Sequence, residues 1–237
     1  MTCIITELRS RARPSPACRP LPATIEVMHG DMAANWAFAE DFRPLGEPAL
    51  RARDRASELG LAAPSPGACA LITVLTAAVG AKSAVDIGTG AGIGALAVLA
   101  GMPTGGVLTT IDAESEHLDA ARAAFAEAEI PAGATRLINS RPLEVLPRLA
   151  DAAYDLVLLN ATGAHDTDRL EDALRILRVG GVLVVNGAFG FGRVPDPALR
   201  DPGTTSVREL VRAVRGLEGF ALTLVPAGDG VLVAVRQ

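Results

Sequence analysis

Val85-Asp86-Ile87-Gly88-Thr89-Gly90-Ala91-Gly92 is the stretch from which the fold is predicted. Its first three residues are typical of a buried strand, and the closely spaced glycines that follow are typical of a tight turn leading into a helix over 92–101. Because glycine has no side chain, the backbone of such a turn approaches a ligand closely. We therefore expect a strand, a ligand-binding turn and a helix, in that order.

A second expected strand, 107–111, leads directly into Asp112. When two such strands are neighbours in a doubly wound sheet, the glycine turn and the carboxylate line one crevice at the carboxyl edge of the sheet. A carboxylate at that point accepts hydrogen bonds from both hydroxyls of a ribose. The two elements together predict a site for an adenosine-type cofactor.

The rest of the chain alternates between short β-branched runs and alanine-rich segments of helical character, which predicts repeated βα units. Apolar runs without polar alternation favour a parallel sheet that is covered on both faces. The expected strands are 84–87, 107–111, 135–138, 156–159, 182–185, 220–225 and 231–235, and the expected helices are 47–59, 65–79, 92–101, 115–128, 142–150, 166–178 and 204–216. Ser65 followed by Pro66 predicts the start of the second of these helices.

The last two expected strands are joined only by residues 226–230, which permit a hairpin but no parallel crossover. We therefore predict an α/β fold with a doubly wound, Rossmann-like sheet of seven strands, parallel except for one antiparallel strand in the C-terminal hairpin. Residues 1–30 are interpreted as a disordered tail, 31–80 as N-terminal helices and 81–237 as the cofactor-binding domain.

Composition excludes several functional classes. The chain has 237 residues, of which 49% are hydrophobic, and a formal net charge of -5. This rules out a disordered chain and argues against nucleic acid as a partner, since binding it requires Lys and Arg to neutralise phosphates. Cys3, Cys18 and Cys69 fit neither a disulfide framework nor a zinc spacing, so a reducing, cytoplasmic setting is expected. The longest apolar stretch, 68–81, is too short to span a bilayer, and no membrane partner is expected.

Two kinds of adenosine cofactor fit the glycine pattern. Gly90-Ala91-Gly92-Ile93-Gly94-Ala95 matches the dinucleotide pattern with alanine at its last position, which favours NAD. Three features favour S-adenosylmethionine instead: the acidic Asp86, the glycine register that starts at Gly88, and the terminal hairpin. A carboxylate near the loop suits the cationic amino-acid end of that cofactor and is awkward beside a pyrophosphate.

At these residues the sequence resembles class I S-adenosylmethionine-dependent methyltransferases, and within them the caffeoyl-CoA and catechol O-methyltransferase-like family. The resemblance runs from about Pro64 to Gln237 and rests on residues 64–66, 86–90, 110–112, 144–147, 154–157 and 177–181. It implies that Asp86 and Gly88 lie near the methionine moiety of the cofactor, Asp112 at the ribose and Ala113 at the adenine. The cofactor contacts that it implies are Pro64, Asp86, Gly88, Thr89, Gly90, Gly94, Asp112, Ala113, Arg141 and Thr162.

The sequence departs from that family at its metal site. Metal-dependent members carry an Asp after the fourth strand and an Asp-Asn pair after the fifth, whereas this chain has Asn160 and Asn186-Gly187. No carboxylate remains there to balance the charge of a divalent cation, so no metal ligand is assigned. The family's lysine, often taken as the general base, is here Gly163. Two cofactor positions differ as well, because a common serine is Gly94 and the usual acidic residue near the adenine is Arg141.

A hydroxyl nucleophile without a metal still needs a base. The loop 160–166 after the fourth expected strand is expected to face the crevice. His165 is its best candidate, because a histidine accepts a proton near neutral pH, and Asp166 or Asp168 is expected to orient it. Asn160 is expected to face the acceptor as the second catalytic residue.

Aromatic residues gather in two places outside these motifs. Trp36, Phe38 and Phe42 predict a helix that either packs on the core or covers the active site or a dimer partner. Phe189 and Phe191, after the fifth expected strand, are candidates for an apolar wall against an acceptor ring.

Together these observations predict an S-adenosylmethionine-dependent methyltransferase that methylates an oxygen of a small-molecule acceptor without a divalent metal. One alternative is an NAD-dependent oxidoreductase, motivated by the glycine pattern at 90–95. The other is a catalytically silent cofactor-binding or scaffold protein, motivated by the lost lysine, serine and ligand acids. The resemblance further implies a homodimer.

Overall fold

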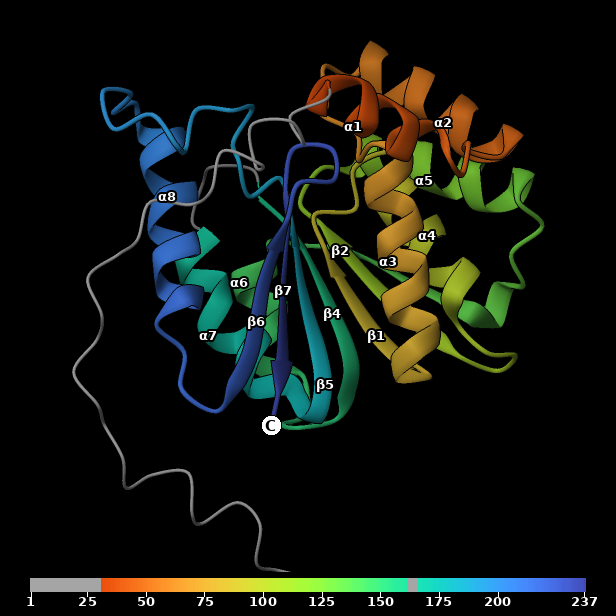
Figure 1. The fold of residues 1–237 in the computed structure, drawn as a ribbon. Coiled ribbons are helices and arrows are strands. Elements are labelled where there is room, and N and C mark those ends of the chain that lie inside the picture. The colour runs from red at the N-terminus through yellow and green to blue at the C-terminus, as the bar shows by residue number, and fades with distance from the viewer. Residues whose placement is uncertain (1–30, 162–165) are drawn as a thin grey trace, which may run out of the picture. The chain divides into compact units, whose positions relative to one another are not determined.

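The computed structural model describes residues 31–161 and 166–237 (Figure 1). The chain divides into two compact units, Met1–Trp36 and Ala37–Gln237, and the second carries the sheet. None of the helices in the described ranges is both long and apolar enough to cross a membrane. The domain boundaries expected from the sequence, at residues 30 and 80, stay predictions.

The described part of the second unit is built on one sheet of seven strands. The strands are β1 (Ser83–Ile87), β2 (Val107–Asp112), β3 (Thr135–Asn139), β4 (Tyr154–Asn160), β5 (Leu177–Asn186), β6 (Phe220–Val225) and β7 (Val231–Arg236), in the spatial order β3-β2-β1-β4-β5-β7-β6. Neighbours from β3 to β5 pair in parallel, whereas β7 is antiparallel to both β5 and β6. The predicted fold class, with its single antiparallel strand in a C-terminal hairpin, is confirmed.

Helices cover both faces of the sheet (Figure 1). The helices are α1 (Met32–Asp41), α2 (Glu47–Glu58), α3 (Pro66–Val79), α4 (Ile93–Gly101), α5 (Ser115–Glu127), α6 (Pro142–Val145), α7 (Asp166–Ile176) and α8 (Pro202–Arg215), with short 3-10 turns η3 (Ala132–Ala134) and η4 (Leu146–Arg148). Successive strand residues point to opposite faces, so Ala84 and Leu156 join a core with α2, α3, α4 and α5, while Val85 and Val157 join a core with α7 and α8. Both faces are apolar, as a parallel sheet between two helical layers requires.

Two of the expected helices are shorter than the sequence indicates. The expected helix 142–150 is the single turn α6 followed by η4, because Pro147 lies inside it and has no amide hydrogen to continue the helical pattern. The expected helix 166–178 ends at Ile176. Leu177 pairs with Tyr154 at the start of β5, and the Arg178 guanidinium donates to Asp155 Oδ1 at 2.6 Å. Strand pairing therefore prevails over helical periodicity at this point.

The start of α3 is fixed by two side-chain acceptors. Ser65 Oγ accepts from the Ala68 amide at 3.1 Å, which confirms the predicted cap, and Glu40 Oε2 accepts from the Gly67 amide at 2.8 Å. Glu40 Oε1 also accepts from the Gly228 amide at 2.6 Å, in the turn between β6 and β7. A carboxylate from α1 thus joins the first turn of α3 to the terminal hairpin.

The aromatic residues of the first helix do not pack on the core. α1 forms over Met32–Asp41, but none of its residues is buried, and Phe38 and Phe42 are exposed. Of the alternatives that the sequence left open for this segment, packing on the domain core is not observed for Phe38 or Phe42. The polar anchor of the helix is Glu40.

A close crossing of α3 and α4 gives a test of the packing. A Cβ on Gly101 would lie 2.7 Å from the Thr76 Cβ and in direct conflict with the Thr73 carbonyl oxygen, which is backbone and cannot turn away. We expect Gly101→Ala to lower the free energy of unfolding by about 1–3 kcal/mol. A matched control is Gly133→Ala, because nothing lies within 4 Å of a Cβ there. Urea unfolding of both variants checks this, and equal stability of the two would contradict the crossing.

Candidate functional site

The glycine turn after β1 has the backbone conformation that its sequence predicts. Gly88 has φ +85 and Gly92 has φ +90, a region that residues with a side chain rarely adopt. The Gly88 amide donates to the Ile111 carbonyl at 2.9 Å, which ties the turn to β2. A Cβ on Gly92 would lie 3.1 Å from Ala121 of α5. Both conformation and crowding therefore require glycine here.

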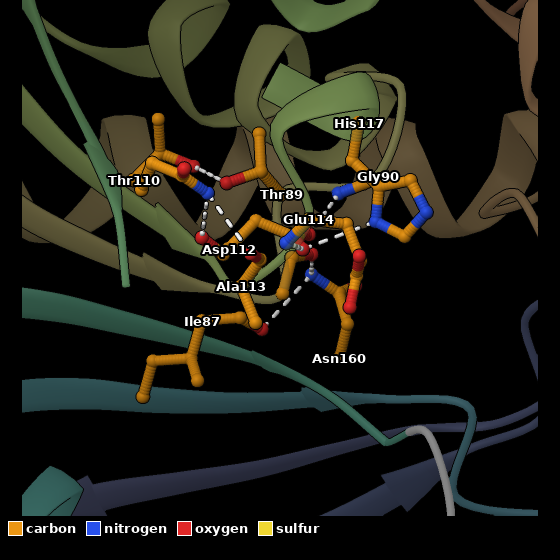
Figure 2. A network of polar contacts seen from close by, with 11 residues as sticks. Ile87, Thr89, Gly90, Thr110, Asp112, Ala113, Glu114, His117 and Asn160 are labelled. Carbon is orange, nitrogen blue, oxygen red and sulfur yellow. Dashed lines mark hydrogen bonds and ion pairs between the residues drawn. The ribbon is translucent and has the colours of Figure 1, made fainter. Parts of the chain in front are cut away.

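The same turn approaches the end of β2 through Asp112 (Figure 2). Asp112 Oδ2 accepts from the Gly90 amide at 2.9 Å, and Oδ1 accepts from the Glu114 amide at 3.0 Å. The residue is 8% exposed and lines a cavity. Asn139 Nδ2 holds the adjoining backbone by donating to the carbonyl oxygens of Asp112 and Ala113 at 3.2 and 3.0 Å. A rigid carboxylate with free lone pairs thus lies beside the glycine turn.

His117 is a site residue that the sequence analysis missed. Its Nδ1 lies 3.0 Å from Asp112 Oδ1, and the residue lines the same cavity (Figure 2). The first turn of α5 brings it back over the end of β2. A signal was present, since side chains near the start of a helix that follows a strand point toward that strand's carboxyl end.

Asp86 lies beneath the turn and not on the cavity wall. It is fully buried: Thr110 Oγ1 donates to its Oδ2 at 2.7 Å and Asn160 Nδ2 donates to its Oδ1 at 3.0 Å. The pKa of Asp86 is raised to about 7, chiefly by burial and in smaller part by the nearby Asp112 carboxylate, and the two hydrogen bonds oppose the rise. The structure therefore places Asp86 as a support for Thr110 and Asn160.

The raised pKa of Asp86 predicts a pH-dependent stability. The native carboxyl binds its proton more tightly than an unfolded one, whose pKa is about 3.9. Its stabilising contribution is therefore full below about pH 4 and is lost as the pH rises through about 7. We expect the difference in unfolding free energy between wild type and Asp86→Asn to fall by about 1 kcal/mol or more from pH 5 to pH 8. Urea unfolding at four pH values measures it, and a difference that does not change with pH would refute it.

Two asparagines continue the network at the ends of β4 and β5. Asn160 Nδ2 donates to Asp86 Oδ1 at 3.0 Å and to the Gly88 carbonyl at 2.9 Å. Asn186 Nδ2 donates to Asn160 Oδ1 at 3.1 Å. The two residues are register partners on adjacent parallel strands, so their side chains lie on the same face. Asp86, Asn160 and Asn186 form a continuous hydrogen-bonded chain, which we call the amide chain.

These elements surround one cavity of about 670 Å³ at the carboxyl ends of the parallel strands. The predicted site residues that line it are Pro64, Gly88, Thr89, Gly90, Gly94, Asp112, Ala113 and Asn160. Asp86 and Arg141 do not line it, although Pro142, the neighbour of Arg141, does. Thr162 and His165 lie outside the described residues. The structure thus brings most of the predicted cofactor contacts together.

Gly94 is held by packing against β4. A Cβ there would lie 3.1 Å from Leu158 Cδ2 and 3.7 Å from Asn160 Oδ1. The Cβ of a serine, common at this position in the resembling family, would crowd Leu158 and would contact Asn160 at an ordinary van der Waals distance. Glycine in place of the family's serine therefore allows α4 to approach β4 and the amide chain closely.

The far side of the cavity is formed by the loop after β5 and by the terminal hairpin. Phe191, 75% exposed, lines it, and its amide donates to Asp229 Oδ2 at 2.8 Å. Arg193 and Asp201 line it as an ion pair at 2.6 Å. Phe189 does not line it, because its ring packs on Gly230. Of the two expected wall residues, Phe191 alone faces the cavity.

Known proteins similar to this chain point to one family. Residues 57–237 match the family model described as O-methyltransferase. A curated relative of Mycobacterium tuberculosis, named a probable O-methyltransferase, is 47% identical over 202 residues, which are 85% of this chain and 90% of that protein.

Solved structures agree with this comparison. A protein from Corynebacterium glutamicum superposes with a TM-score of 0.76 at 31% identity, covering 90% of this chain and 97% of its own. The O-methyltransferase TomG from Streptomyces achromogenes, involved in tomaymycin synthesis and solved in complex with SAM, has a TM-score of 0.74 at 25% identity. That match covers 86% of this chain and 96% of TomG.

Proposed function

The chain belongs to the O-methyltransferase family, and from that membership we propose that it methylates a hydroxyl oxygen of a small acceptor without a divalent metal. Its cofactor is S-adenosylmethionine, which supplies an electrophilic methyl group on a sulfonium sulfur. The observation that carries the proposal is the meeting of the glycine turn and Asp112 at one cavity.

The residues of the cavity fit this cofactor. Asp112 offers carboxylate lone pairs to a ribose, while the glycines at 88 and 90 leave room beside the turn. His117 lies against Asp112, and Ala113 and Pro142 supply an apolar edge for an adenine. We propose that these residues bind and orient the cofactor. The positively charged amino-acid end is proposed to lie beside Asn160, on the side of the cavity nearest to Asp86.

The donor set does not fit a hard divalent cation. At the positions where metal-dependent relatives carry carboxylates, Asn160 turns its amide nitrogen to Asp86 and its oxygen to Asn186. Its nitrogen is a donor and cannot ligate a cation, and its oxygen already accepts from Asn186. A cation at this point would have only neutral amide oxygens from Asn160 and Asn186 as ligands, with no carboxylate to balance its charge. Among the described residues, no three His, Cys, Asp or Glu side chains gather into a group that could hold a metal. These donors support a reaction in which a base removes the hydroxyl proton.

His165 stays our proposed base, although it lies outside the described residues. The loop that contains it joins Asn160 to α7, and both Asn160 and Arg169 of α7 line the cavity. This position favours a base from that loop. Homodimer formation and a cytoplasmic location are likewise proposals that rest on the resemblance and on cysteine usage. The glycine pattern at 90–95 is the observation that motivates a nicotinamide cofactor, and the titration below tests it.

Calorimetric titration tests the cofactor part of the proposal. S-adenosylmethionine and S-adenosylhomocysteine are each titrated into the full chain, with EDTA and with magnesium, and NAD serves as the matched adenosine control. We expect micromolar affinity for the first two, unchanged by magnesium, and no heat from NAD. Binding of NAD in place of the other two would overturn the proposal.

A further inference from the structure

The amide chain fixes which atom each asparagine presents. Asn160 Nδ2 lies 3.0 Å from a carboxylate oxygen of Asp86 and 2.9 Å from the Gly88 carbonyl oxygen. The Gly88 carbonyl oxygen can only accept, so the amide group that faces it and Asp86 must be the NH₂ donor. The Asn160 oxygen therefore points away from Asp86, toward β5.

The orientation of the Asn160 amide determines that of Asn186. Asn186 faces the oxygen of Asn160, so it presents its own NH₂ at 3.1 Å. Its Oδ1 is then directed away from Asn160, and no described residue donates a hydrogen bond to it. Asn186 also lines the cavity. A buried carboxylate thus determines that an acceptor oxygen is available on the side of the cavity where β5 ends.

An acceptor oxygen at this point suits a neutral hydroxyl. A hydroxyl that donates its hydrogen to Asn186 Oδ1 keeps its oxygen lone pairs for attack on a methyl carbon. A phenolate would find a repelling oxygen there.

We infer that Asn186 orients the acceptor through one neutral hydroxyl, so that this enzyme accepts monohydroxylated phenols and gains nothing from a second, vicinal hydroxyl. This rests on the proposed function. In the reaction the hydroxyl oxygen bonds to the methyl carbon as the carbon–sulfur bond breaks. The electron pair of that bond stays on sulfur. As the oxygen–carbon bond forms, the hydroxyl proton leaves its hydrogen bond to Asn186 and passes to the base or to water. A second, vicinal hydroxyl is useful where the two oxygens together chelate a cation. Here the amide chain places two neutral amides at that position, so a second hydroxyl has no cation to bind.

The test uses phenol, guaiacol and catechol as probes. Guaiacol has the shape of catechol, but its second hydroxyl is already methylated. S-adenosylhomocysteine release is followed in EDTA, and cofactor dissociation constants are measured by calorimetry. For wild type we expect values of kcat/KM for guaiacol and catechol within about 3-fold of each other. For Asn186→Ala we expect about a 10-fold to 30-fold fall in kcat/KM for both, because one hydrogen bond is lost, with an unchanged cofactor dissociation constant.

Two further variants separate orientation from folding. Asn186→Ser keeps a small polar side chain that is too short to reach the acceptor hydroxyl, so it is expected to lose rate as Asn186→Ala does, and its melting temperature reports whether it is folded. Asn139→Ala removes the amide that holds the backbone of Asp112 and Ala113, so it is expected to weaken cofactor binding and leave the KM for guaiacol unchanged.

Three results would overturn the inference: equal kcat/KM for wild type and Asn186→Ser, a preference for catechol over guaiacol above 100-fold, or no release from either monophenol by protein that binds the cofactor. Failure of wild type to bind S-adenosylmethionine or S-adenosylhomocysteine at all would overturn the proposed function itself.

Discussion

Asp112→Ala is expected to weaken the binding of S-adenosylmethionine by at least about 100-fold. The side chain lies at the end of β2 with its oxygens fixed by the amides of Gly90 and Glu114. Hydrogen bonds from two ribose hydroxyls to a carboxylate contribute about 1.5–3 kcal/mol each, and both are lost in the variant. The glycine turn also loses the acceptor that holds Gly90. Calorimetric titration of the folded variant measures the effect.

The matched control for this variant is Asp119→Ala. Asp119 is also an aspartate near the start of α5, but its side chain is 72% exposed and pairs with Arg122. We expect it to bind the cofactor like wild type. Asp112→Asn, which keeps the shape and one acceptor oxygen, should lie between wild type and Asp112→Ala. Cofactor binding by Asp112→Ala within 3-fold of wild type would show that the ribose is held elsewhere.

Asn160→Asp is expected to destabilise the protein and to make its stability depend on a divalent cation. The substitution sets a second carboxylate about 3.0 Å from buried Asp86 and removes the donor to the Gly88 carbonyl. Two carboxylates at this distance do not both ionise without a compensating charge, so we expect a loss of about 3 kcal/mol at pH 8 in EDTA. Millimolar manganese should restore part of that loss by binding the native state.

The control for Asn160→Asp is the exchange Asp86→Asn/Asn160→Asp. It returns the pair to one carboxylate and one amide, so we expect the manganese response to disappear and much of the stability to return. Thermal unfolding of wild type, single and double variants in EDTA and in manganese gives the comparison. A single variant as stable as wild type in EDTA would mean that Asp86 and residue 160 do not interact as described.

The sheet and the cofactor edge could be predicted because they depend on local patterns. Short β-branched runs between alanine-rich segments predicted all seven strands, six of them to within two residues at each end, whereas β5 begins five residues before its expected start. The five-residue link 226–230 required the hairpin. The glycine turn and Asp112 were predicted to meet, and the structure joins them by the Gly90 amide. Such features follow from the period of side chains and from turn chemistry.

Other features depend on contacts between distant segments, which no local pattern carries. Asp86 was expected to face the ligand, but its side chain points into the sheet core beside Thr110, where burial raises its pKa. The link from Glu40 to Gly67 and Gly228 joins residues far apart in the chain. The orientation of Asn186 depends on a chain of hydrogen bonds across three strands. These three features are determined only once distant segments of the chain have come together in the fold.

Methyl transfer in the absence of metal ions is the most direct test of the account. The full chain is freed of metal by EDTA, supplied with S-adenosylmethionine carrying a labelled methyl group, and incubated with guaiacol. We expect labelled product at the same rate, within about 2-fold, whether EDTA or magnesium is present. Activity that vanishes in EDTA and returns with magnesium would contradict it.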